Sequence, residues 1–216
     1  MSAVQPLDPA RERILLLTLA GVQFAHILDF MVMMPLGPIL IGALTIDTHR
    51  FGLLVSSYTF SAAAAGVLAA TFVDRFERKR LLLLMFGLFA LATLACGLAP
   101  GYLTLLAARC AAGAFGGVLG SMVQTIVGDL IPFERRGRAS GTIMSAFALS
   151  TVAGVPASLY LANHFGWRFP FLFIAAMAAG LPKTACFAYE ILLKNSPRDY
   201  DLSMAYGEAL AASQET

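Results

Sequence analysis

The chain has 216 residues, of which 58% are hydrophobic and 13% are charged, and its mean hydropathy is +0.75. Soluble domains contain about 25% charged residues, so this composition indicates a membrane protein with the lipid bilayer as its solvent. The net charge of +2 is too small to indicate a nucleic-acid partner. The sequence contains no phosphate-binding loop, dinucleotide fingerprint or metal-ligand spacing, so it predicts neither an enzyme nor a metal or cofactor site.

Six apolar runs follow one another along the chain, and a helix of roughly 20 apolar residues is enough to cross a bilayer. The runs are residues 14–40, 51–73, 81–99, 103–127, 141–162 and 169–181. Short polar segments or a Pro-Gly turn separate them. The sequence therefore predicts an all-α membrane protein with six transmembrane helices over residues 14–181, preceded by an N-terminal segment (1–13) and followed by a tail (182–216).

Lysine and arginine residues are distributed unevenly between alternate ends of these runs. One side holds only Arg50 and Arg168, whereas the other holds nine cations. The nine are Arg11, Arg13, Arg75, Arg78, Lys79, Arg80, Arg135, Arg136 and Arg138. Because cytoplasmic loops are enriched in positive residues, the N-terminus and the tail are both predicted to be cytoplasmic.

The sixth run is the weakest of the six. Residues 169–181 make a helix of only about 20 Å, which does not span the hydrocarbon core unless it continues through Pro182 and Lys183. Beyond Pro182 the composition changes, because five acidic residues fall in the remaining chain. We expect a cytoplasmic tail that starts at residue 182 and differs in character from the bundle.

Two ionisable residues, Asp29 and Arg109, lie well inside predicted helices. At the rise of a helix, Asp29 lies about 22 Å from the inner face and Arg109 about 10 Å from the outer face, so both reach a similar depth in the outer half of the layer. A charge at this depth costs at least a few kcal/mol and is usually paired inside a bundle or beside a water cavity.

The functional interpretation of this pair is a proton- or substrate-binding site, in which Asp29 titrates and Arg109 is its countercharge. The structural alternative is an inert pair that only fixes a helix contact, or an Arg109 side chain that snorkels outward. His26 lies one turn from Asp29 on the same helical face and is assigned to the site, with a hydrogen-bonded interior histidine as the alternative.

Small residues in the predicted helices favour close helix packing. Gly113 and Gly117, Gly116 and Gly120, and Ala62 and Gly66 each have the small-xxx-small spacing that lets two backbones approach. In the fifth run, Gly154 and Pro156 predict a kink, because proline removes one helical hydrogen bond.

The segment between the second and third runs concentrates charge, so it lies outside the hydrocarbon. Residues 70–79 fit the pattern G-x-x-x-D-R-x-G-R-[RK], although Ala70 and Glu77 occupy two of its glycine positions. The matching positions are Asp74, Arg75, Arg78 and Lys79. In the fourth run, Arg109 and Gly113 fit the pattern R-x-x-x-G.

With these motifs in order, residues 14–180 resemble the amino-terminal half of a major facilitator superfamily transporter, closest to bacterial drug and metabolite exporters. The antiporter motif of the fifth helix is present in part, through Pro156, while Leu159 and Tyr160 replace its glycine pair. The resemblance implies a secondary transporter of the cell inner membrane that moves small organic molecules, with proton-coupled efflux as the expected mode. It also implies that the segment of Asp74 to Lys79 gates the cytoplasmic side.

Members of this family have two six-helix halves around a site at the bilayer midplane, and the chain supplies one half. Its expected partner is therefore a C-terminal six-helix half or a second copy of the chain. We also expect a truncation, frameshift or fusion junction near Gly180. The alternatives are an inactive transporter fragment or six-helix membrane interaction protein, and a half-transporter that works as a homodimer.

Overall fold

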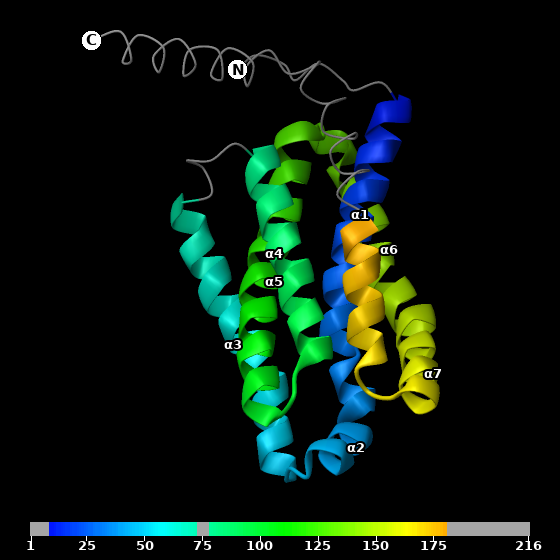
Figure 1. Cartoon of the computed structure of the whole chain (residues 1–216). Coiled ribbons are helices and arrows are strands. Elements are labelled where there is room, and N and C mark those ends of the chain that lie inside the picture. Colours follow the sequence, from blue (N-terminus) through cyan, green and yellow to red (C-terminus); the bar gives the residue numbers. More distant parts are fainter. Residues whose placement is uncertain (1–8, 73–77, 181–216) are drawn as a thin grey trace, which may run out of the picture.

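The computed structural model describes residues 9–72 and 78–180, and within these ranges it is helical and has no β-strand. The helices run up and down in one bundle (Figure 1). In chain order they are α1 (Pro9–Met31), α2 (Met33–Leu44), α3 (Thr48–Phe72), α4 (Arg78–Leu98), α5 (Tyr102–Leu130), α6 (Phe133–Leu149), the π-helix η2 (Ser150–Gly154), α7 (Val155–Phe165) and a last helix, Phe169–Gly180.

These helices follow the six predicted runs and confirm the predicted all-α fold. The pair α1 and α2 corresponds to the first run, and α6, η2 and α7 together correspond to the fifth. By length and composition, five helices of the described chain are able to cross a membrane, while Phe169–Gly180 is a shorter apolar helix. Within the described residues, the sixth run is helical from Phe169 to Gly180.

The first run is not the single helix that the sequence predicted, because it is interrupted after Met31. Pro35 has no N–H to donate to the carbonyl of Met31, and in a regular helix its ring would clash with that carbonyl. The backbone remains connected across the break through bonds from the Val32 nitrogen to the Leu28 oxygen (2.9 Å) and from the Leu36 nitrogen to the Val32 oxygen (3.3 Å). As a result, α2 begins as a separate helix at the end of the bundle (Figure 1).

The polar segment between the fourth and fifth predicted runs is mostly helical, because α5 continues to Leu130 and α6 already begins at Phe133. Arg136 explains the compact corner between α5 and α6. Its Nε donates to the Ile131 oxygen at 3.0 Å and its Nη2 to the Gly128 oxygen at 2.5 Å. An arginine on α6 thereby satisfies carbonyls at the C-terminus of α5, so the charges belong to a helix rather than to a loop.

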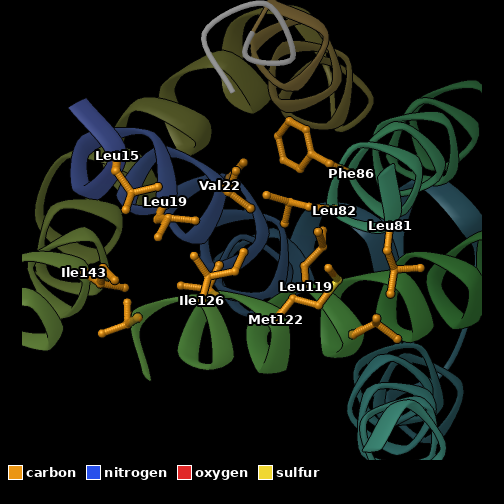
Figure 2. Packing of buried hydrophobic residues seen from close by; sticks show 14 of the residues in the cluster. Leu15, Leu19, Val22, Leu81, Leu82, Phe86, Leu119, Met122, Ile126 and Ile143 are labelled. Atoms are coloured by element: carbon orange, nitrogen blue, oxygen red, sulfur yellow. The ribbon is translucent and has the colours of Figure 1, made fainter. Parts of the chain in front are cut away.

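The main apolar cluster joins α1, α4, α5 and α6. Figure 2 shows leucine, valine and isoleucine side chains from these helices pointing toward one another, with Phe86 of α4 among them. The labelled members are Leu15, Leu19, Val22, Leu81, Leu82, Phe86, Leu119, Met122, Ile126 and Ile143. The cluster fixes α1 against α5, which is the contact that carries the ionisable residues.

Helix α3 packs along α5 more extensively than any other two labelled elements pack together. At Gly113, an added Cβ would overlap the Ser61 hydroxyl and the backbone of Tyr58, and at Gly117 it would overlap the backbone of Ala62. Backbone approach this close is possible only without a side chain. The predicted role of these small residues in helix packing is confirmed.

We expect Gly117→Ala to lower the free energy of unfolding by about 1–3 kcal/mol, because the new methyl group forces the α3 and α5 backbones apart. Gly128→Ala is the matched control on the same helix, since no atom lies within 4 Å of its added Cβ. That control should be neutral, or stabilising by about 0.5–1 kcal/mol. Reversible unfolding in mixed micelles, followed by circular dichroism, measures both, and equal effects would contradict the packing argument.

Several predictions fall on residues that the structure does not describe. Asp74 and Arg75 of the charged segment lie outside the described ranges, as does everything after Gly180, including the tail from residue 182. Arg78 and Lys79 form the first residues of α4, but their side chains are not described. The gating role of this segment therefore stays a prediction.

Candidate functional site: a buried ion pair

The structure brings Asp29 of α1 and Arg109 of α5 together, although 80 residues separate them in sequence. The Arg109 Nη1 atom lies 2.8 Å from Asp29 Oδ2 and also donates to the Asp29 backbone oxygen at 3.1 Å. Both side chains have an exposed fraction of 0%. The depth argument from the sequence placed the two residues at the same level, and the observed contact agrees with it.

The ion pair is only partly satisfied by hydrogen bonds. Within the described part of the chain, Asp29 Oδ1 and the Nε and Nη2 atoms of Arg109 have no hydrogen-bond partner. Thr93 of α4 lies against the same carboxylate. Burial of two ions costs several kcal/mol each unless attraction and hydrogen bonds offset that cost. This pair is thus better suited to a change of partner or of protonation than a fully bonded structural pair would be.

Tyr58 of α3 covers the other side of Arg109. Its ring centroid lies 4.3 Å from the Arg109 guanidinium carbon, which is the geometry of a cation–π contact. Its hydroxyl donates to the backbone oxygen of His26 at 3.4 Å, and its ring packs beside that of Phe30 with centroids 5.6 Å apart. The sequence analysis missed Tyr58. The available signal was a phenol in the middle of an apolar span, where its hydroxyl requires a partner.

Among the hydrogen bonds and ion pairs of the described residues, none joins the His26 side chain to Asp29 or Arg109. Its Nδ1 atom is 3.3 Å from the Gln23 backbone oxygen, and its ring packs against Gly116 and Gly120 of α5. His26 instead lines a recess of about 220 Å³. The other lining residues are Ile27, Phe30, Tyr58, Thr59, Ala62 and Phe147, from α1, α3 and α6.

The fifth predicted helix changes geometry at the position where Gly154 and Pro156 predicted a kink. Residues Ser150–Gly154 form a π-helix that ends two residues before Pro156, so the backbone hydrogen bonds are rearranged where Pro156 has no N–H to donate. A Cβ on Gly154 would lie 2.7 Å from Leu28 Cδ1, and the Ser150 hydroxyl donates to the Phe24 oxygen at 3.3 Å. This irregular turn therefore packs directly on α1, about one turn from Asp29.

The described residues contain no group of three or more His, Cys, Asp or Glu side chains that could hold a metal ion. The candidate site consists of the Asp29–Arg109 ion pair, the Tyr58 ring that lies over Arg109, and the adjacent recess. Its possible chemistry is proton exchange at a carboxylate and electrostatic binding at a guanidinium.

A bundle of apolar spans with a buried acid–base pair between the first and fourth spans is typical of a membrane transport protein. A family model described as Major Facilitator Superfamily matches residues 19–201. The chain belongs to this family, and it is a multi-pass membrane protein. The expected junction near Gly180 stays a prediction.

Curated relatives are longer than this chain. It is 30% identical over 162 residues to the "Uncharacterized MFS-type transporter YtbD" of Bacillus subtilis, a match that covers 75% of this chain and 41% of the relative. It is 33% identical over 117 residues to the "Vacuolar membrane amino acid uptake transporter fnx2" of Schizosaccharomyces pombe, covering 54% of this chain and 20% of the relative. The chain thus spans less than half the length of these relatives.

A solved structure has the same arrangement of helices. A bacterial homolog of the human lysosomal transporter Spinster, in an inward-facing and occupied conformation, superposes with a TM-score of 0.70 at 20% sequence identity. The superposition covers 84% of this chain and 44% of that one. At this identity the likeness shows the fold alone.

Proposed function

We propose that this chain forms one half of a secondary active transporter that moves small organic molecules across the cell inner membrane in exchange for protons. Both termini are cytoplasmic in this proposal, as the distribution of lysine and arginine favours. The observation that carries it is the fully buried Asp29–Arg109 pair, which has hydrogen-bonding capacity left over. Membership of the family supports transport in general, and the pair supports proton coupling.

In the proposed mechanism, Asp29 binds the proton and Arg109 compensates the carboxylate charge while the proton is absent. Protonation of Asp29 removes the negative charge, which frees Arg109 to bind an anionic group or to move toward another acceptor. The π-helical turn on α1 provides a segment whose geometry can change near the acid. The charged segment with Asp74, Arg75, Arg78 and Lys79 closes the cytoplasmic side against a second half.

The second half is a C-terminal six-helix bundle or a second copy of this chain. Two halves are required because alternating access arises when one bundle rocks against the other around a shared site. The competing function is that of an inactive fragment or a six-helix interaction protein. Chemical crosslinking in native membranes tests the second copy, since a homodimeric transporter gives a crosslinked dimer and an isolated fragment does not.

The direct test uses the chain in liposomes that contain a pH-sensitive dye and an imposed proton gradient. Amino acids and the lipophilic cation ethidium are added in turn as probes. We expect at least one probe to collapse the gradient faster than it does in protein-free liposomes. If no probe does so, and the protein is monomeric by crosslinking, a homodimeric transporter is excluded, and the remaining interpretations are an inactive fragment and a half that works only with a C-terminal six-helix half.

A further inference from the structure

The recess and the ion pair share one neighbouring side chain, Tyr58. Tyr58 and His26 line the recess, whereas Asp29 and Arg109 do not and are fully buried. Tyr58 lines the recess and also has its ring over Arg109. The Tyr58 ring therefore borders both the recess and the buried Asp29–Arg109 pair.

Three neighbours hold the ring in this position. Arg109 attracts its face, the ring of Phe30 packs at its side, and the backbone oxygen of His26 accepts its hydroxyl hydrogen. Gly116 of α5 leaves room for the hydroxyl, because a Cβ there would lie 2.6 Å from the Tyr58 oxygen. At 3.4 Å the hydroxyl bond lies beyond the usual range for such bonds, so the ring is held mainly by packing and by the cation.

The residues that line the recess suit a ligand that would bind there and contact the Tyr58 ring. Three of its lining residues, Phe30, Tyr58 and Phe147, are aromatic, while His26 and Thr59 add polar groups. A planar apolar molecule that stacks in the recess would contact the Tyr58 ring. Movement of Tyr58 would then expose the Arg109 guanidinium, two of whose nitrogens lack partners, and the Asp29 oxygen that also lacks one.

We propose that the ring of Tyr58 is the barrier that separates the recess from the Asp29–Arg109 pair, and that its displacement connects the two. This makes Tyr58 a positioning residue for the pair. The part of the proposal that links displacement to proton exchange rests on the proposed function. The barrier itself is a property of this chain and can be tested without transport.

Cys96 of α4 provides a natural reporter, because it is fully buried and lies within interaction range of Arg109. In a background with Cys110→Ser and Cys186→Ser, the rate of Cys96 labelling by a water-soluble maleimide is measured in opened membrane vesicles. We expect Tyr58→Ala to accelerate labelling by about tenfold or more, because thiol reactivity follows exposure and water access. Tyr58→Phe, which keeps the ring, should remain as slow as the parent.

Two controls separate the barrier from general loosening. Phe60→Ala removes an aromatic ring from the same helix at a position that is 75% exposed, and it should leave the Cys96 rate unchanged. A Val123→Cys reporter in a Cys96→Ser background probes the apolar cluster elsewhere on α5 and should stay unreactive in Tyr58→Ala. Slow labelling of Cys96 in Tyr58→Ala, fast labelling in Tyr58→Phe, or equal acceleration at Val123→Cys would overturn the proposal. None of these outcomes depends on whether the chain transports a substrate.

Discussion

Arg109→Met is expected to lower the free energy of unfolding by about 3–5 kcal/mol, because it leaves the Asp29 carboxylate buried without a countercharge. Methionine approximates the length and apolar stem of arginine, so the main change is the loss of charge and of two hydrogen bonds to Asp29. Unfolding in mixed micelles, followed by circular dichroism, gives the difference from the unchanged protein.

Two controls identify the cause of that loss. The double variant Asp29→Asn/Arg109→Met removes both charges and should recover most of the lost stability, since a neutral pair requires no countercharge. Arg50→Met removes an exposed arginine and should change stability by less than about 1 kcal/mol. If Arg109→Met behaves like Arg50→Met, the burial of the pair has no energetic consequence in the membrane and the site as described is wrong.

The fold was predictable because an apolar chain can cross a membrane in only a few backbone structures. Long apolar runs must become helices, since only helices and closed barrels satisfy the backbone in hydrocarbon. Asp29 and Arg109 could be recognised in the sequence for the same reason, because burying a charged group inside a membrane span costs free energy and such groups are usually paired. Their depth could be calculated from helical rise alone, which is why the pair was predictable although 80 residues separate its members.

The features that sequence reasoning missed depend on contacts between distant segments or on local backbone competition. The break after Met31 results from Pro35, whose effect falls four residues upstream within a uniformly apolar run. The early start of α6 depends on Arg136, which binds carbonyls of the preceding helix rather than water. The sequence could mark Tyr58 as a phenol inside an apolar span, but its contact with Arg109 depends on the small residues of α5 that let α3 approach.

The ion pair and the recess could be distinguished only in the three-dimensional structure. His26 and Asp29 share a helical face in the sequence pattern, so one site seemed sufficient for both. In the structure His26 lines the recess, whereas Asp29 pairs with Arg109 and does not line it. Under the barrier proposal, a role for His26 in the same site requires movement of Tyr58.

Proton-gradient-driven transport by Asp29→Asn tests the proposed coupling site most directly. The assay uses the liposomes described above and the probe that collapses the gradient with the unchanged protein, with Asp29→Glu as the variant that keeps the titratable group. We expect Asp29→Asn to reduce gradient-driven flux by about 100-fold or more, because the amide cannot bind and release the proton, while exchange of the probe without a gradient persists. Asp29→Glu should retain part of the coupled flux. Unchanged gradient-driven flux in Asp29→Asn would contradict the assignment of Asp29 as the proton-binding residue.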